Sequence, residues 1–229
     1  MSPHRFLSLL QFADGLFPAG AYAHSFGLEW YVQEGIVRDA AGVKEFLETY
    51  LESSVGPKDA VAMIHSMEPA RRTDLPAILD IDQTLEAMKP VSELRQASRQ
   101  MGRQTLRTAV SLNEDRFLED FFTLIESSDT AGHHAAVFGA IGGRLDWPRQ
   151  QAAQAFLHSA AAAIVGAALR LLPLGQVAGQ QILWSLGPLI ESLVDIVQTE
   201  SLEEMWSFTP ALEIASARHS SLSARLFRS

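Results

Sequence analysis

The 229-residue chain has no cysteine, and only three of its 18 basic residues are lysines. The missing cysteine excludes disulfides, thiolate metal sites and a cysteine nucleophile. Acidic residues number 27, so the net charge is −9, which argues against a nucleic-acid binder. Hydrophobic residues make up 47% of the chain and charged residues only 20%, which excludes disorder of the whole chain. The length suits one domain, or at most two, with a real core.

The short motifs of several common chemistries are also missing. There is no GxxxxGK[ST] or GxGxxG phosphate loop, no HExxH zinc motif and no GxSxG nucleophile elbow. His24 stands beside Ser25 without a recognisable Ser-His-acid motif. The pair His133 and His134 near Asp129 suggests a metal site, but adjacent helical residues point about 100° apart, which favours capping or packing. We therefore predict no catalytic residue, no metal ligand and no cofactor.

Long uninterrupted apolar runs are absent as well. The N-terminus has too short an apolar run for a secretory signal. Arg170 is the only charge between Gln150 and Ile190, but a membrane span needs about 20 mostly apolar residues. Polar residues and proline interrupt every such window: Gln150, Gln151, Gln154, His158, Pro173, Gln176, Gln180 and Gln181. We expect two central, buried helices in a cytoplasmic protein with no membrane partner.

Apolar residues recur at helical spacing along most of the chain, and no alternating strand pattern of useful length occurs. Asp39 and Asp74 are candidate N-caps, and Pro57 suits the first turn of a helix running to Met67. Further helices are expected over 75–87, 92–112, 117–125, 134–144, from Trp147–Pro148 to about 172, and over 176–199 with a kink at Gly187–Pro188. The sequence predicts an all-α single domain over residues 1–229 with roughly nine or ten helices.

Charge is segregated near the C-terminus. Residues 171–217 contain six acids and no basic residue, whereas residues 218–229 contain three arginines and no acid. This basic tail has two interpretations: it folds back on the acidic segment, or it is a mobile arm that becomes ordered on a partner.

Arg95, Arg99, Arg103 and Arg107 follow one another at i+4 spacing and form a stripe on the helix over 92–112. Such a stripe is either a solvated face whose charge is balanced by acids elsewhere in the fold, or a docking face for an acidic protein surface.

Four blocks along the chain carry a shared pattern. They are LQFADGLFPAGAYAHSFGLE at 10–29, ELRQAS with MGR at 93–103, RLLPLGQ at 170–176, and IASARH at 214–219 with SARLFRS at 223–229. In order and spacing these blocks resemble the UreF family of urease accessory proteins over the whole length of the chain.

The resemblance implies an all-helical, dimeric nickel-insertion chaperone and not an enzyme. Such a protein bridges UreD (also called UreH), which sits on the urease apoprotein, and the nickel-carrying GTPase UreG, and it regulates GTP-dependent nickel delivery. It need not hold the metal tightly. The uncharged helices around Arg170 then fit a central helix and a dimer contact.

The resemblance also implies partner-binding residues. These are Tyr22, His24, Ser25, Glu29, Arg95, Gly102, Arg103, Arg218, His219 and Arg225. Among them, Tyr22 and Arg225 match positions that help to assemble the complex, and the tail over 218–229 becomes ordered on UreD/UreH. Arg95 and Arg103 are expected at interior or interface positions, and Arg99 and Arg107 at the surface.

The alternative from another class is a helical hydrolase with an unrecognised histidine-centred site. It requires His24 or His134 to be hydrogen-bonded to both a carboxylate and a hydroxyl.

Overall fold

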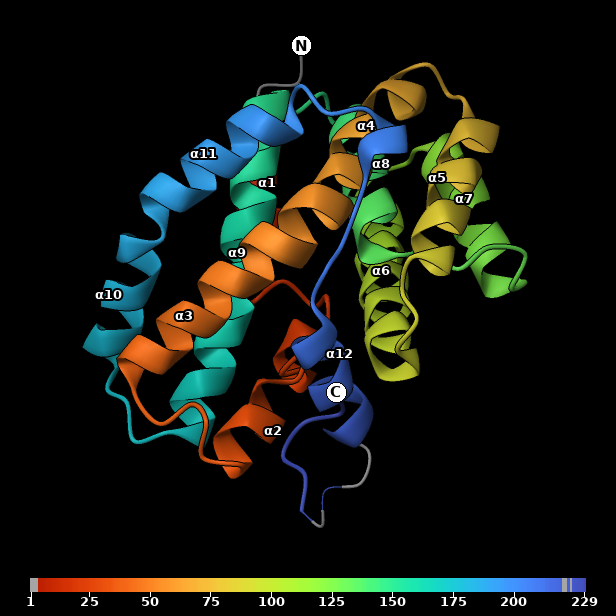
Figure 1. The fold of residues 1–229 in the computed structure, drawn as a ribbon. Coiled ribbons are helices and arrows are strands. Elements are labelled where there is room, and N and C mark those ends of the chain that lie inside the picture. The colour runs from red at the N-terminus through yellow and green to blue at the C-terminus, as the bar shows by residue number, and fades with distance from the viewer. Residues whose placement is uncertain (1–3, 220–221, 223) are drawn as a thin grey trace.

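The computed structural model describes residues 4–219, 222 and 224–229, and every regular element within them is helical (Figure 1). The all-α prediction is therefore confirmed. The elements are α1 (Arg5–Ala13), the 3₁₀ turn η1 (Ala21–Ala23), α2 (Leu28–Gln33), α3 (Ala40–Tyr50), the π-helix η2 (Leu51–Ala60), α4 (Val61–Arg71), α5 (Leu75–Ala87), α6 (Ser92–Leu112), α7 (Arg116–Glu126), α8 (His134–Arg144), α9 (Arg149–Leu171), α10 (Gln176–Ser185), α11 (Gly187–Val197), the 3₁₀ turn η3 (Leu202–Glu204) and α12 (Pro210–His219). The described residues hold more helices than the roughly nine or ten expected, because short helices such as α1, α2 and α12 have too few turns to show a period.

Several helix boundaries agree with the sequence signals. The side chains of Asp39 and Asp74 accept hydrogen bonds from backbone N–H groups in the first turns of α3 and α5, at 2.9 and 3.2 Å. Helices α5, α6 and α8 begin and end at the expected residues. Pro173 follows the end of α9, and α10 and α11 join at Leu186, beside the predicted kink at Gly187–Pro188.

The prediction that Pro57 opens a helix is wrong. Pro57 lies inside η2, and residues 40–71 form one helical path through α3, η2 and α4. The wider π turn accommodates a residue that has no N–H to donate to the preceding turn. Carbonyls of η2 instead accept hydrogen bonds from the segment before α12: Trp206 N donates to Pro57 O at 3.2 Å, and Phe208 N donates to Ser53 O at 2.9 Å.

Helix α9 lies at the centre of one half of the molecule, with α1, α2, α10, α11 and η2 packed around it (Figure 1). It is the one helix in the described part of the chain that is long and apolar enough to cross a membrane. Its neighbours cover apolar side chains such as Leu157 and Ile164, as expected of a core helix. The expectation of a second central helix is wrong, because α10 lies on the outside and leaves Trp184 88% exposed.

The other half is organised by α4 and α8, which pack closely with the help of two glycines. A Cβ atom on Gly139 would lie 2.1 Å from Met63 O, and one on Gly143 would lie 2.2 Å from Met67 O. The backbones of the two helices therefore touch where any other residue would hold them apart. Helices α5 and α6 pack against this pair.

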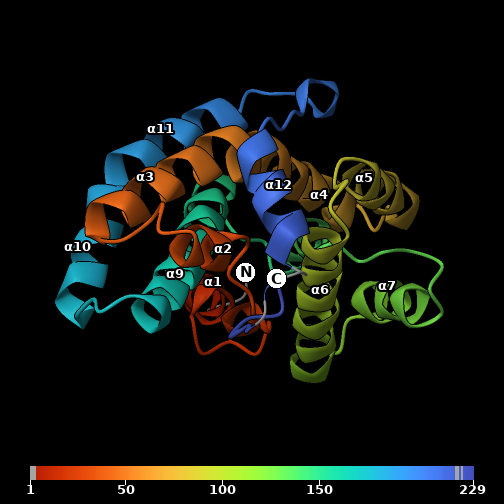
Figure 2. The same ribbon diagram turned by 60° about the horizontal axis from the view of Figure 1, so that its bottom comes forward.

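The N-terminal segment and the C-terminal tail lie side by side between the two halves, with α9 on one side and α6 on the other (Figure 2). Ser229 is 1% exposed there. The two ends of the chain thus meet at the place where most of the predicted partner-binding residues lie.

Candidate partner-binding site

A sharp turn before α2 prepares the N-terminal segment to bind the tail. Phe26 and Gly27 both have positive φ angles, +51° and +90°, and a Cβ on Gly27 would lie 2.8 Å from Ser216 Oγ. The turn presents the N–H groups of Ser25 and Phe26, which both donate to Ser229 O, at 2.6 and 3.1 Å. The Ser25 hydroxyl donates to the same oxygen at 2.9 Å. One backbone oxygen of the tail is therefore held by three donors.

Glu29, in the first turn of α2, is the main acceptor for the tail. Its carboxylate is 2% exposed and accepts from Leu226 N at 2.7 Å and from Phe227 N at 3.1 Å. The same carboxylate is 2.8 Å from His219 Nε2. Because a buried carboxylate is stable only when its oxygens are paired, these contacts make Glu29 the anchor of residues 226–227.

His219 lies between two carboxylates and extends this anchor to α6. Its Nε2 faces Glu29 and its Nδ1 lies 3.0 Å from Glu93 Oε2. Glu93 Oε1 also lies 3.4 Å from Arg225 Nη1. Ionised carboxylates only accept hydrogen bonds, so this arrangement requires a proton on both ring nitrogens or on one carboxyl. We call Glu29, Glu93, His219 and Arg225 the Glu29 cluster. Its two carboxylates approach opposite nitrogens and do not converge on a position for one metal ion.

Arg170, at the end of α9, holds the tail from the other side. Its guanidinium lies 3.7 Å from the ring centre of Tyr22 and 4.1 Å from that of Phe227, between the two rings. It also donates to the backbone oxygen of Tyr22 at 2.7 Å. The planar cation therefore joins the N-terminal segment to the tail by stacking on both. Tyr22 itself remains 73% exposed and open to a partner.

Two other histidines are held in apolar surroundings. His24 Nδ1 lies 2.8 Å from Ser229 Oγ, whereas its buried Nε2 has no hydrogen-bond partner among the described residues. Burial, with a smaller effect from Arg228, lowers the pKa of His24 to about 4. His134 packs on Phe156, and burial lowers its pKa to about 4 as well. Within the described residues neither ring is bonded to a carboxylate, so the stated condition for the hydrolase alternative is not met at either one.

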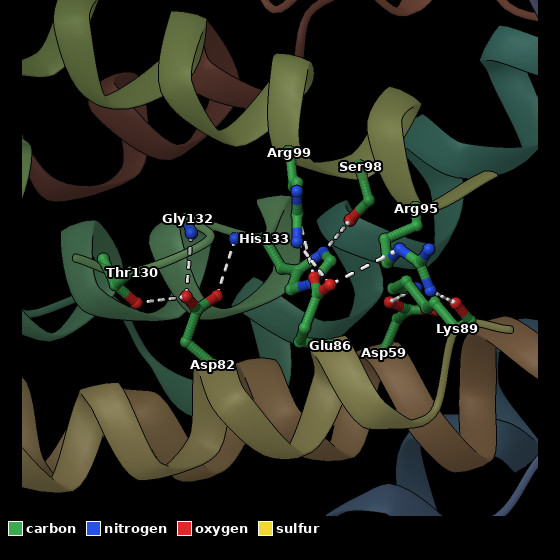
Figure 3. A network of polar contacts seen from close by, with 10 residues as sticks. All are labelled: Asp59, Asp82, Glu86, Lys89, Arg95, Ser98, Arg99, Thr130, Gly132 and His133. Carbon is green, nitrogen blue, oxygen red and sulfur yellow. Dashed lines mark hydrogen bonds and ion pairs between the residues drawn. The ribbon is translucent and has the colours of Figure 1, made fainter. Parts of the chain in front are cut away.

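A second polar network joins α5, α6 and the segment before α8 (Figure 3). Fully buried Asp82 accepts from Thr130 Oγ1 at 2.5 Å and from the N–H groups of Gly132 and His133, both at 2.7 Å. Its carboxylate thereby fixes the loop that leads into α8.

Glu86 is the second acid of this network. It accepts from Arg99 Nε at 2.9 Å, lies 2.9 Å from His133 Nε2 and 3.4 Å from Arg95 Nε (Figure 3). The other nitrogen of the fully buried His133 ring is 3.0 Å from Ser98 Oγ. Burial, together with the charge of Lys89, lowers the pKa of His133. The two adjacent histidines therefore lie in separate surroundings, His133 in this network and His134 against Phe156.

Acids of other elements balance the charge of three arginines of the α6 stripe: Arg95, Arg99 and Arg103. For these three, the interpretation as a face whose charge is balanced within the fold is confirmed. Arg95 and Arg99 pair with Glu86, and Arg103 pairs with Glu126 at 2.6 Å. Arg99 joins the Glu86 network although its side chain is 43% exposed, whereas the side chain of Arg103 is 54% exposed. The expected interface positions of Arg95 and Arg103 stay a prediction.

Comparison with known proteins identifies the fold family. The UreF family model matches residues 37–187. The chain is 35% identical over 221 residues to a urease accessory protein UreF of Trichodesmium erythraeum, covering 96% of this chain and 95% of the relative. It is 32% identical over 226 residues to that of Bacillus sp. strain TB-90, covering 99% and 100%. The chain belongs to the UreF family.

Six of the ten partner-binding residues expected from the UreF resemblance come together between the two halves. They are Tyr22, His24, Ser25, Glu29, His219 and Arg225. Arg218 lies nearby, 5.9 Å from the ring centre of Trp30. Three others lie apart on α6: Arg95, Gly102 and Arg103. Gly102 has a packing reason of its own, because a Cβ there would lie 1.9 Å from Gly132 O.

Proposed function

We propose that this UreF-family chain is a nickel-insertion chaperone that bridges UreD/UreH and the GTPase UreG and regulates GTP-dependent delivery of nickel to the urease apoprotein. Membership of a family of urease accessory proteins is shown by the relatives above. We further propose that the protein performs this bridging role in the cytoplasm.

The observation that carries the proposal is the contact between the tail and the N-terminal segment. It gathers residues from both ends of the chain around Glu29, which is buried, while Tyr22 and Arg225 keep much of their side chains at the surface. A surface built from a detachable tail suits binding that is gained and lost in each cycle of metal delivery. These contacts favour the interpretation of the tail as folded against the protein. Among the described residues its supports are the N-terminal segment, Glu93 and Arg170.

Nickel is cargo in this proposal and not a resident cofactor. Within the described residues no group of three or more histidine, aspartate or glutamate side chains is arranged to hold an ion. The regulated GTPase and the urease apoprotein then supply the metal sites at the two ends of the delivery.

We place the dimer contact on the outer face of α10. This face carries Trp184, 88% exposed, and Val177, 72% exposed, and residues 171–190 contain no charge. Near the two-fold axis of an isologous contact a residue lies close to its own copy, so an uncharged apolar face suits such a contact better than a charged one, which repels itself. In Figure 1 this helix lies along one edge of the molecule, away from the tail.

Co-purification with UreD/UreH tests the partner surface. Arg225→Ala and Tyr22→Ala are expected to lose the complex, while Arg116→Ala, whose side chain on α7 is 83% exposed, keeps it. All three proteins should retain the helical content of the parent chain. Normal recovery of the complex with both test variants would refute the surface proposed here.

Sedimentation of the chain alone tests the dimer contact. Trp184→Glu places a charge at the centre of the proposed contact and should give a monomer. Ile36→Glu, at a site 58% exposed in the turn after α2, is the matched control and should remain dimeric. A parent chain that sediments as a monomer, or a dimeric Trp184→Glu protein, would refute the assignment.

One observation favours a hydrolase as a second candidate. His133 is bonded to the Ser98 hydroxyl and to the Glu86 carboxylate, although Glu86 also pairs with Arg99. A fluorophosphonate reagent distinguishes the candidates, because an activated Ser98 would be labelled and an adaptor would not. We expect the parent chain and the Ser98→Ala variant to give the same labelling, because Ser98 is not activated in an adaptor.

A further inference from the structure

A cavity of about 600 Å³ lies between the two halves of the molecule. Its walls come from the N-terminal segment over residues 12–22, η2, the start of α6, α9 and α12. The volume falls in the range of small-molecule sites, about 300–1,000 Å³. Most of the lining is apolar, with side chains such as Phe156, Met101 and Leu94. Of the partner-binding residues proposed above, Tyr22 also lines this space.

Polar groups line the cavity on several elements, among them Arg170 on α9 and His134 on α8, and those on η2 and its neighbours form one cluster. Lys58 and Lys89 are 6% and 8% exposed, and both ammonium groups approach Asp59. Lys89 Nζ takes the short contact, 2.6 Å from Asp59 Oδ1, whereas Lys58 Nζ is 3.9 Å from Oδ2. Two buried cations thus share one carboxylate whose side chain is 14% exposed, and Lys58 makes the longer and weaker contact with it. Half-buried Glu213 also lines the cavity and balances the charge only from a distance.

Lys58 has few other partners. Its ammonium lies 3.2 Å from Ser54 Oγ and 3.4 Å from Ser207 Oγ, and neutral hydroxyls compensate a buried charge poorly. Burial, followed by the charge of Lys89, lowers the pKa of Lys58 to about 8. An anionic group in the cavity beside Lys58 would supply the missing charge.

Two structural features keep the cavity free of side chains from the fold and line it with polar groups. The π-helix η2, a rare element that recurs at functional sites, turns Ser54, Lys58 and Asp59 toward it. On the opposite wall Gly166 of α9 has no atom within 4 Å of where its Cβ would be, so glycine is not needed there for packing. A small residue at that position keeps the space free.

We propose that this cavity binds a small organic carboxylate with an apolar body, with the carboxylate on Lys58 and the body against α9. One negative charge matches Lys58, whose acid partner Asp59 is shared with Lys89, and the apolar walls suit an aromatic or aliphatic body. A nucleotide fits poorly, because no glycine-rich phosphate loop lines the cavity and Asp59 and Glu213 would repel several phosphate charges.

The test uses 4-phenylbutyrate and its uncharged amide as probes, with calorimetric titration of the full chain. The acid should bind at least about tenfold more tightly than the amide, as expected for one charge-assisted contact. Lys58→Met keeps the length of the side chain and should abolish this preference. Lys44→Met, on the exposed side of α3, is the matched control and should preserve it.

A second variant blocks the space without touching the charge. Gly166→Leu points into empty volume and should fold normally, yet it should prevent binding of both probes. Equal binding of acid and amide by the parent chain would overturn the assignment, as would the absence of binding or an unchanged preference in Lys58→Met. Binding that survives Gly166→Leu would place the ligand elsewhere and would also overturn it.

Discussion

The α4–α8 contact and the Glu29 cluster both join segments that are distant in sequence, but by opposite means. Gly139 and Gly143 let two helices meet backbone to backbone, with no room for a further carbon atom. The Glu29 cluster is instead built from polar contacts to a few residues of the tail. A close-packed contact does not open without unfolding, whereas a polar anchor can exchange its partners for water or for another protein.

The largest expected effect of a substitution on stability comes from disrupting the close-packed contact between α4 and α8. Gly139→Leu would place its side chain against Met63 O, so we expect a loss of about 3 kcal/mol or more in the free energy of unfolding. Urea unfolding measures it. Gly166→Ala is the control, since its Cβ meets open space and removes a helical glycine, and it should be neutral or stabilise by up to about 1 kcal/mol. Equal stability of the two variants would contradict the packing argument.

On the polar side, Glu29→Gln should release the tail while leaving the helices intact. At least one donor among Leu226 N, Phe227 N and His219 then faces an amide N–H₂, at a cost of about 2 kcal/mol. Hydrogen exchange should speed up at Leu226 and Phe227 and not in α4 or α8. The exposed Glu34→Gln serves as control. Slow exchange at both amides in Glu29→Gln would show that other contacts hold the tail.

Acid should weaken the molecule through its buried neutral histidines. The folded-state pKa values of His24 and His134, about 4, lie below the ordinary value near 6.5, so the unfolded chain takes up protons first. Stability is therefore full above about pH 6.5 and falls as the pH drops from 6.5 toward 4, by about 3 kcal/mol for each histidine at pH 4. Urea unfolding at pH 7 and pH 4.5 measures this loss, and His134→Phe should reduce it. An unchanged loss in that variant would remove His134 from the explanation.

The smallest effect is expected at the cation between the two rings. Arg170→Lys keeps the charge but loses the flat guanidinium between Tyr22 and Phe227, so tail stability should fall by about 0.5–1 kcal/mol. Exchange at the amide of Phe227 reports it, and Arg116→Lys, at an exposed site on α7, is the control. A tail as stable as in the parent chain would show that the Glu29 cluster and the contacts of Ser229 hold it without the guanidinium.

Much of the helical fold was accessible from the sequence because capping residues and apolar spacing are local signals. Asp74 and the pattern over 75–87 define α5 to the residue. The π-helix could not be predicted from the sequence. Two of its carbonyls accept hydrogen bonds from the N–H groups of Trp206 and Phe208, which lie about 150 residues away in the sequence. Proline at position 57 is locally typical of a helix start, but tertiary contacts place it inside a helix.

The candidate site divides in the same way. The family resemblance pointed to Glu29, His219 and Arg225, but not to Glu93 as the group that links them, because proximity between α6 and α12 is a tertiary fact. A signal for Asp82 did exist in the sequence: it shares the buried face of α5 with Ile78, Ile81 and Leu85, and an acid on an apolar stripe indicates a buried acceptor.

Reconstitution of urease maturation tests the central claim most directly. Urease apoprotein, UreD/UreH, UreG, nickel and GTP are combined with the parent chain, with Arg225→Ala, or without either, and urease activity is followed. The account predicts activation and altered GTP turnover with the parent chain, and little of either with Arg225→Ala. Equal urease activity with and without the parent chain would contradict an adaptor in nickel delivery.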